Sequence, residues 1–179
     1  DYGTTEVADH ALALALAMTR GTVSYSEALR ADPGGNWNYR LAPLVRRQKG
    51  LTFGVIGLGR IGLAAARRAA AFDMKVVFYD PYLPNGVDLA TGCERARSLA
   101  ELAGRSDIVS IHAPLSEETR GLVGSDFFAV AKDGMLLVNT ARGPIVDIDA
   151  LLAALKSGRV GGAGLDVLPV EPADARHPL

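Results

Sequence analysis

The segment from Leu51 to Gly62 constrains the fold of this chain more than any other part of its sequence. A short apolar run, typical of a buried strand, leads directly into Gly57-x-Gly59-x-x-Gly62, and an alanine-rich segment of helical composition follows. Glycines allow the sharp turn and close packing of helix on strand, and the free N–H groups at the helix N-terminus favour a bound phosphate. The pattern alone is weak, because 20 of the 179 residues are glycine.

A second apolar segment, Lys75 to Tyr79, strengthens the interpretation because it ends in an acid, Asp80. Asp80 follows the glycines by roughly 20 residues, the spacing at which dinucleotide folds place a ribose-binding carboxylate. Such an acid favours NAD over NADP because it repels a 2′-phosphate. The alternative for Asp80 is a turn-forming role before Pro81. We predict a dinucleotide site whose cofactor is NAD.

Strand and helix patterns alternate along the rest of the chain. Strands are expected at 52–56, 75–79, 108–112, 135–139 and 162–166. Helices are expected at 61–72, 99–104, 126–131 and 149–157. Such alternation predicts an α/β fold with a doubly wound parallel sheet, of Rossmann type, over residues 51–179.

Residues 1–50 are expected to form a long helical arm and a connecting segment of the same domain. The alanine and leucine run predicts a helix from Glu6 to Arg20 that continues towards Leu29. The turn-forming stretch 32–36 ends it, and a basic segment, 37–49, leads to the first strand.

The composition of the chain limits the kinds of partner that it is expected to bind. The net charge of −1 argues against nucleic acid as the main partner, and the apolar run 11–18 is too short to cross a membrane. The single Cys93 excludes an internal disulfide and fits a reducing compartment, so a cytoplasmic location is expected.

The chain begins without methionine and stops in a predicted loop, and we expect both ends to be cut from a longer protein.

Polar residues at the predicted strand ends are the candidates for chemistry, since ligands bind at that edge of the sheet. His112 lacks a visible partner, so we expect its backbone to line the adenosine side and do not expect a general base. Arg142, among small residues, suits a carboxylate substrate; a surface arginine is the alternative. Of Asp166 and Glu171, one could hold the cofactor's carboxamide and the other pair with a base, or both could be ordinary loop acids. No metal site is expected.

Five ordered motifs, GLGRIG, FYDP, HAPLSEET, NTARG and GxxGLDVxxxEP, resemble the cofactor-binding portion of the D-isomer-specific 2-hydroxyacid dehydrogenases. That family includes phosphoglycerate, formate and D-lactate dehydrogenases and the C-terminal-binding-protein corepressors. The resemblance runs from about Thr5 to Leu179. The stretch FYDPYLPNGV and the opening EVAD look nearest to the C-terminal-binding-protein-like and phosphoglycerate-dehydrogenase-like branches.

The resemblance implies a role for each motif. Arg142 would bind the substrate carboxylate and polarise its carbonyl, and Glu171 would pair with a histidine that acts as general acid/base. Hydride would move between substrate C2 and the nicotinamide. The residues implied in NAD binding are Gly57, Leu58, Gly59, Arg60, Ile61 and Gly62 at the pyrophosphate, Asp80 at the ribose, His112, Ala113, Pro114 and Thr119 on the adenine side, and Thr140, Ala141, Arg142 and Asp166 at the nicotinamide riboside and carboxamide.

The sequence also departs from the family pattern. The catalytic Pro-His motif and the substrate domain are expected outside this chain, and His177 should not be mistaken for that histidine. We therefore expect NAD binding with little turnover, and a homodimer formed through the helical arm. Two alternatives are an NAD-sensing corepressor and a Rossmann-fold enzyme of another chemistry, such as adenosylhomocysteine hydrolase; the NTARG and GLDVxxxEP motifs argue against the second.

Overall fold

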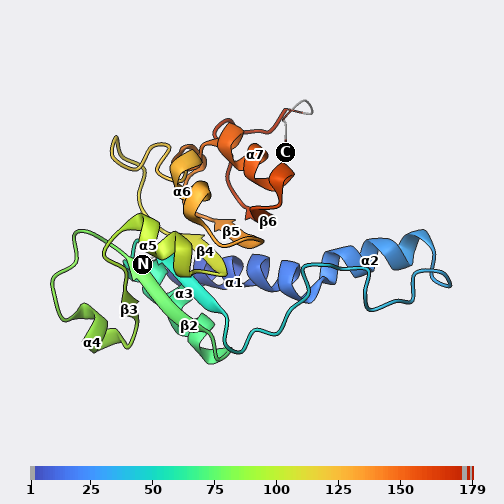
Figure 1. The fold of residues 1–179 in the computed structure, drawn as a ribbon, viewed down its shortest axis with the longest axis horizontal. Coiled ribbons are helices and arrows are strands. Elements are labelled where there is room, and N and C mark those ends of the chain that lie inside the picture. The colour runs from blue at the N-terminus through green and yellow to red at the C-terminus, as the bar shows by residue number, and fades with distance from the viewer. Residues whose placement is uncertain (1–2, 175–176, 178) are drawn as a thin grey trace.

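Parallel strands in the order β3-β2-β1-β4-β5-β6 form a single sheet in the part of the chain that the structure describes (Figure 1). The structure is a computed structural model and describes residues 3–174, 177 and 179. The predicted doubly wound parallel sheet is confirmed. The strands are β1 (Thr52–Ile56), β2 (Lys75–Tyr79), β3 (Glu94–Arg95), β4 (Ile108–Ile111), β5 (Met135–Asn139) and β6 (Val160–Leu165).

The central strands β1, β4 and β5 are almost entirely buried, as expected for unbroken apolar runs in a sheet covered on both faces. Strand β1 pairs with β2 on one side and with β4 on the other, so the strand order reverses there. The loops that follow β1 and β4 consequently lie next to each other at the carboxyl edge of the sheet, where open α/β sheets bind their ligands.

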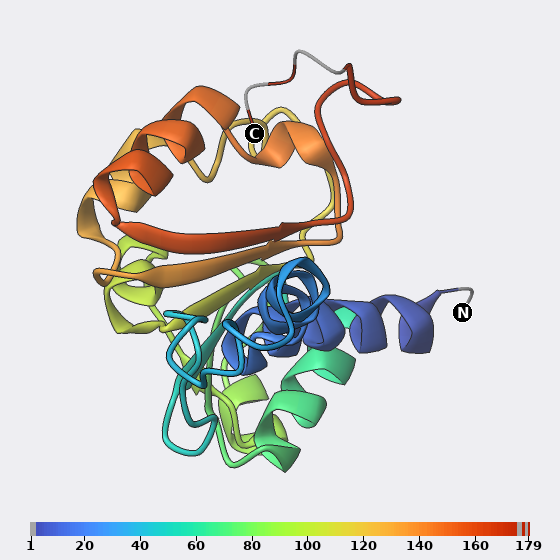
Figure 2. The same ribbon diagram turned by 90° about the vertical axis from the view of Figure 1, so that its right-hand side faces the viewer.

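Helices cover both faces of the sheet (Figure 2). On one face α1 (Thr4–Arg20) packs against α3 (Arg60–Ala71) and against β5 and β6. On the other face lie α5 (Leu99–Arg105), α6 (Ser125–Val130) and α7 (Ile148–Ser157). Each face has its own cluster of buried apolar side chains. Right-handed crossovers place helices on both faces in this way.

Helix α1 lies closely on the sheet because β6 is built from small residues. A Cβ atom at Gly164 would come within 2.9 Å of the Leu14 Cβ, and one at Gly162 within 3.2 Å of the Met18 sulfur. The buried positions of α1 recur at helical spacing: Ala8, Ala11, Leu12, Ala15 and Thr19. Most of the predicted arm is thus a packed layer of the domain.

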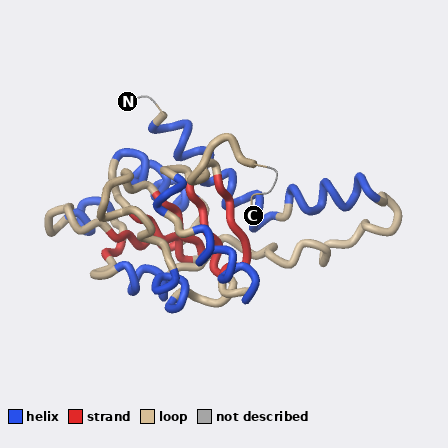
Figure 3. The backbone as a smooth tube through the Cα atoms, turned by 90° about the horizontal axis from the view of Figure 1, so that it is seen from above, coloured by secondary structure: helices blue, strands red, loops and turns tan. Residues whose placement is uncertain are grey.

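The helix expected to continue towards Leu29 is interrupted at Gly21. Gly21 has a φ of 67° and ends α1, and a separate helix, α2 (Thr22–Ala31), begins after it. A Cβ at Gly21 would lie 2.7 Å from the Ala42 Cβ, so only glycine fits. Helix α2 has no buried residue and projects away from the sheet together with the loop that follows it (Figure 3).

Three short elements were not expected from the sequence: α4 (Val87–Thr91), the two-residue strand β3, and a 3-10 turn at Gly143–Ile145. Elements of this length carry no periodicity to detect. Strand β6 also begins and ends slightly earlier than predicted, and β4 stops before His112. Within the described residues, none of the helices combines the length and apolar character needed to cross a membrane.

Candidate functional site

The glycine-rich turn joins β1 to α3 at the point where the strand order reverses. Gly57 has a φ of 87°, and a Cβ there would lie 2.8 Å from the backbone nitrogen of Ala113. A Cβ at Gly62 would lie 2.1 Å from the carbonyl oxygen of Gly57. These two glycines are therefore required for packing the turn against the next loop and the helix against the turn.

Gly59 has a different environment. Its φ is −73°, and a Cβ built on it would meet no atom within 4 Å. The backbone at Gly59 thus borders open space at the start of α3, whose first N–H groups have no partner within the helix. Open space over exposed amides at a helix N-terminus fits a phosphate group.

Asp80 follows β2 and reaches back to the glycine turn. Its Oδ2 accepts a hydrogen bond from the Leu58 N–H at 3.0 Å, and its Oδ1 accepts one from the Tyr82 N–H at 3.0 Å. Asp80 and Gly57 line a pocket of about 210 Å³ together with Ala113, Pro114 and others. The carboxylate thus lies in a pocket beside the glycine turn, where a ribose next to the pyrophosphate would bind.

The rim of this pocket is tied together by side chains from two loops. The Tyr82 hydroxyl, after β2, donates to the Glu118 carboxylate, after β4, and this acceptor raises the pKa of Tyr82. Thr119 fixes the second loop, because its hydroxyl donates to the Pro114 carbonyl at 2.7 Å and accepts the Ser116 N–H at 2.8 Å. Thr119 was expected on the adenine side, and it lines this pocket.

A second pocket, of about 450 Å³, lies on the other side of the glycine turn. Ala113 and Pro114 line both pockets. The remaining lining residues of the second pocket are Val7, Ile61, His112, Leu115, Thr140, Ala141 and Arg142. Expected pyrophosphate and nicotinamide residues therefore meet around one space.

Thr140 and Arg142 give the second pocket its polar character. The Thr140 hydroxyl is buried and has no hydrogen-bond partner among the described residues, so it is available to a ligand. Arg142 is exposed, and its guanidinium donates to the Ala141 carbonyl at 2.6 Å. A carboxylate in this pocket could form charge-assisted hydrogen bonds with Arg142.

Asn139 shapes the loop that carries these residues, a role that the sequence did not predict for it. Its side-chain oxygen accepts the Ala141 N–H, and its side-chain nitrogen donates to the Arg142 carbonyl, both at 3.0 Å. Asn139 is 1% exposed. A buried asparagine at the end of an otherwise apolar strand was the available signal, since such a group needs local partners.

His112 lines the pocket that contains Arg142, and its expected place on the adenosine side stays a prediction. Its Nε2 lies 2.9 Å from the Ser110 hydroxyl. Burial lowers the pKa of His112 to about 4, so the imidazole is neutral at physiological pH. This environment suits a wall residue and disfavours a general base near pH 7.

Asp166 and Glu171, after β6, are not among the residues that line either pocket. Asp166 Oδ1 lies 3.3 Å from His10 Nε2 on α1, a partner that sequence reasoning missed. Glu171 accepts the Leu168 N–H at 2.9 Å. His177 lies in the segment beyond them, and its N–H donates to the Asp174 carbonyl.

The chain matches a known protein family over most of its length. Residues 12–179 match the family model described as "D-isomer specific 2-hydroxyacid dehydrogenase, NAD binding domain". The chain belongs to this family. Its cofactor is NAD.

Relatives of the chain include two kinds of oxidoreductase and a C-terminal-binding protein. It is 40% identical to a glyoxylate reductase of Thermofilum pendens, over 98% of this chain and 52% of that protein. It is 39% identical to C-terminal-binding protein 1 of Caenorhabditis elegans, over 90% of this chain and 23% of that protein. The crystal structure of apo D-mandelate dehydrogenase from Rhodotorula graminis superposes with a TM-score of 0.90 at 39% identity, covering 98% of this chain and 52% of that one. The chain spans about half the length of this reductase and this dehydrogenase.

The site of this 2-hydroxyacid dehydrogenase domain fits NAD in three respects. The Gly59 backbone faces open space at a helix N-terminus. The Asp80 carboxylate lies in the pocket on one side of the glycine turn, and the unpartnered Thr140 hydroxyl lies in the pocket on the other. The parts of a dinucleotide follow the same order, because its pyrophosphate lies between two ribosides.

Proposed function

We propose that this chain is the NAD-binding part of an oxidoreductase that acts on the CH–OH group of D-2-hydroxy acids. The observation that carries the proposal is the position of Arg142 in one pocket with Ile61 of the glycine turn and the unpartnered Thr140 hydroxyl. This arrangement supports a role for Arg142 as the cation that binds a substrate carboxylate beside the expected nicotinamide position. Glyoxylate reductases and a mandelate dehydrogenase among the relatives support a small 2-hydroxy or 2-keto acid as substrate.

Each residue has a proposed role. Bound NAD supplies or accepts the hydride. Arg142 binds the substrate carboxylate and polarises the neighbouring carbonyl. Glu171 pairs with the catalytic histidine and favours its protonated form. Asp166 orients the nicotinamide carboxamide.

The cofactor is held by the turn formed by residues 57–62, by Asp80 at the ribose, and by Thr140, Ala141 and Arg142 at the nicotinamide riboside. Ala113, Pro114 and Thr119 border the adenine. His112 remains a wall residue, neutral at pH 7 because burial lowers its pKa to about 4.

We further propose that residues 1–50 and 51–179 form one domain and that the substrate domain and the catalytic histidine come from outside this chain. No residue of the two described pockets is placed as a general acid/base for the substrate. The 179-residue chain would therefore bind NAD with little or no turnover.

Titration and turnover measurements on this chain test the proposal. Fluorescence titration with NADH should show saturable binding to the wild-type chain. Incubation of the wild-type chain with NADH and glyoxylate, pyruvate or hydroxypyruvate should show almost no NADH oxidation. Turnover at about 1 per second or faster, a common enzyme rate, would show that the catalytic groups lie within these 179 residues. Absence of NADH binding would contradict the proposed function itself.

The corepressor remains the weaker alternative. The match to C-terminal-binding protein 1 reaches only 23% of that protein, so it concerns a part of that protein that enzymes of the family share. Recruitment of a short peptide by the longer protein, unaffected by Arg142→Ala, would favour the corepressor.

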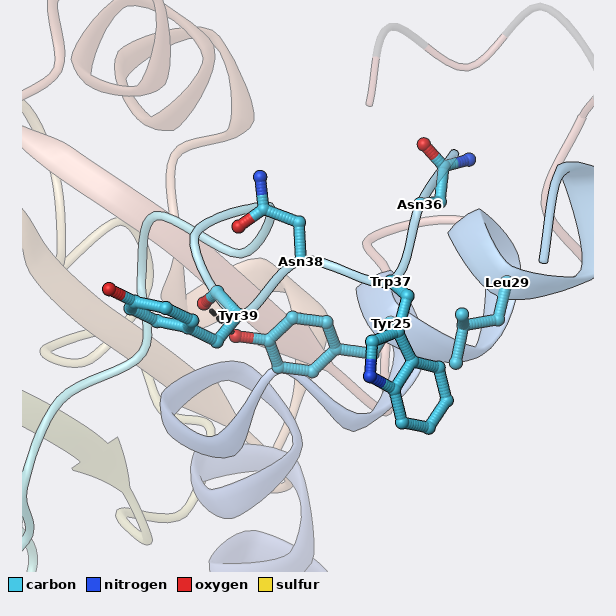
Figure 4. Close-up of a pocket in the computed structure, with 6 residues that line it drawn as sticks. All are labelled: Tyr25, Leu29, Asn36, Trp37, Asn38 and Tyr39. Atoms are coloured by element: carbon cyan, nitrogen blue, oxygen red, sulfur yellow. Dashed lines mark hydrogen bonds between the residues drawn. The ribbon is translucent and has the colours of Figure 1, made fainter. Parts of the chain in front are cut away.

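We also propose a homodimer formed through α2 and the loop after it. Trp37 and Tyr39 are 82% and 77% exposed, an unusual state for large aromatic side chains. With Tyr25 and Leu29 they line a pocket of about 330 Å³, and the Tyr25 hydroxyl donates to the Tyr39 carbonyl (Figure 4). An aromatic patch formed by a projecting helix and the loop after it suits the isologous contact of a twofold dimer. A cytoplasmic location stays a prediction from the single cysteine.

A further inference from the structure

The pocket beside Asp80 contains a second acid, Glu118, which lies in the segment 113–119 that the family resemblance places on the adenine side. Glu118 lines this pocket together with Asp80, Tyr82, Thr119 and eight other residues. None of these described lining residues is lysine, arginine or histidine. The pocket therefore presents two carboxylates and no cationic side chain of its own.

Tyr82 connects the two acids. Its backbone N–H donates to Asp80 Oδ1 at 3.0 Å, and its hydroxyl donates to the Glu118 carboxylate. Glu118 is exposed, so without this bond its side chain would be free to turn towards solvent. The bond holds the Glu118 charge at the rim of the pocket, across from the loop that carries Asp80.

The guanidinium of Arg95 lies behind the same loop but is occupied by the main chain. It donates to the carbonyls of Asp80, Leu83 and Pro84 and lies 4.8 Å from the centre of the Phe78 ring. Arg95 therefore holds the Asp80 loop in place through three hydrogen bonds to its main chain. It does not line the pocket that would receive a 2′-phosphate.

We infer that Glu118 is a second selectivity residue for the cofactor, which acts with Asp80 to exclude a 2′-phosphorylated dinucleotide. A phosphate monoester carries nearly two negative charges at pH 7, and it would enter a pocket with two fixed carboxylates. Like charges placed against an unwanted ligand discriminate without improving the contacts to the wanted one. The inference rests on the proposed assignment of this pocket to the adenosine of NAD.

The experiment compares the dissociation constants of NAD and NADP for the wild-type chain and four variants. Glu118→Gln removes the charge but keeps an acceptor for Tyr82, and Tyr82→Phe removes the bond but keeps the charge. Glu117→Gln is the matched control, because Glu117 is an exposed neighbour of equal charge that does not line the pocket. Asp80→Asn measures the effect of removing the charge of the first acid, with which the effect of Glu118→Gln is compared.

Glu118→Gln should lower the ratio of the NADP to the NAD dissociation constant about fivefold to tenfold, a moderate effect for one charge near the surface. Glu117→Gln should leave the ratio within about twofold of the wild type, because solvent and salt screen a charge outside the pocket. Tyr82→Phe should lower the ratio by less than Glu118→Gln. The effect of Glu118→Gln should shrink when the salt concentration is raised from about 0.05 M to 0.5 M.

Equal ratios for Glu118→Gln and Glu117→Gln would overturn the inference while leaving the NAD site intact. An unchanged ratio in Tyr82→Phe would overturn the role of the bridging hydroxyl. Failure of the wild-type chain to bind NAD would instead overturn the assignment of the pocket, and this inference with it.

Discussion

At the scale of single residues, the glycines of the motif divide into two groups. Gly57 and Gly62 are required by the fold, since a Cβ at either would collide with backbone atoms. Gly59 is free of such contacts and matters only if a ligand covers it. A substitution at Gly59 therefore tests ligand binding alone, whereas one at Gly57 or Gly62 also disturbs the fold.

Gly59→Val should abolish NAD binding while the domain stays folded. The added side chain would occupy the space where the pyrophosphate approaches the helix N-terminus. The lost N-cap preference costs about 1 kcal/mol at most, so the thermal midpoint without NAD should fall by no more than about 4 °C. NADH titration and thermal unfolding check both parts. Undiminished affinity would show that the turn does not face the phosphates.

His112 should make the stability of the chain depend on pH. Its pKa is about 4 in the folded chain, against 6.5 for an unperturbed histidine, so the unfolded chain binds more protons between these values. Stability is therefore fully present above about pH 6.5 and falls as the pH drops towards 4. The loss from this group between pH 7 and 4.5 should be about 2–3 kcal/mol.

Urea unfolding of the wild type and of His112→Asn at both pH values measures this contribution. Asparagine can keep a hydrogen bond to Ser110 but does not titrate. The variant should lose less stability than the wild type on acidification. The same loss in both proteins would mean that His112 is not held neutral in the fold.

At the scale of secondary-structure elements, the glycine-rich strand β6 determines how closely α1 approaches the sheet. Gly162 and Gly164 leave room for the side chains of Met18 and Leu14. The same helix carries His10, which reaches Asp166 just after β6. The packing of α1 on β6 thus also positions Asp166, which is expected at the nicotinamide.

Gly164→Val should destabilise the chain by about 2–3 kcal/mol, because the added side chain overpacks the contact between α1 and β6. Denaturant unfolding gives the free energy. Gly59→Ala is the control, since a Cβ there meets no atom within 4 Å. Equal stability of Gly164→Val and the wild type would mean that α1 does not lie on this strand.

At the scale of the whole molecule, α2 and its loop are the part that the domain leaves unpacked. Helix α2 buries no residue of its own, whereas every other helix of eight or more residues in the described chain does. A projecting helix followed by a loop with exposed aromatic side chains fits the proposed contact with a second copy.

Trp37→Ser should shift the chain from dimer towards monomer. A tryptophan at the centre of an interface commonly contributes 2 kcal/mol or more, which corresponds to about a thirtyfold weaker association. Sedimentation velocity over a range of protein concentrations measures the change. Because Trp37 is 82% exposed in the single chain, its loss should leave thermal unfolding of the monomer unchanged. A wild-type chain that stays monomeric at high concentration would contradict the dimer.

The amino-acid sequence by itself determined the parallel α/β fold and the position of the glycine turn. Both depend on local patterns: apolar runs, glycines and helix formers that dictate their own conformation whatever the rest of the chain does. The order of the strands in the sheet was not predicted from the sequence and comes from the structure. The family motifs are also local patterns, since each is a short continuous stretch of the sequence.

Only the tertiary structure decided which side chains meet. The bond from Tyr82 to Glu118, the pair of His10 and Asp166, and the burial that neutralises His112 join segments far apart in the chain. Such contacts depend on how loops and helices pack, and packing distances leave no periodic signal in the sequence. The break at Gly21 has the same origin, because Ala42 and Val45 occupy the space that a side chain would need.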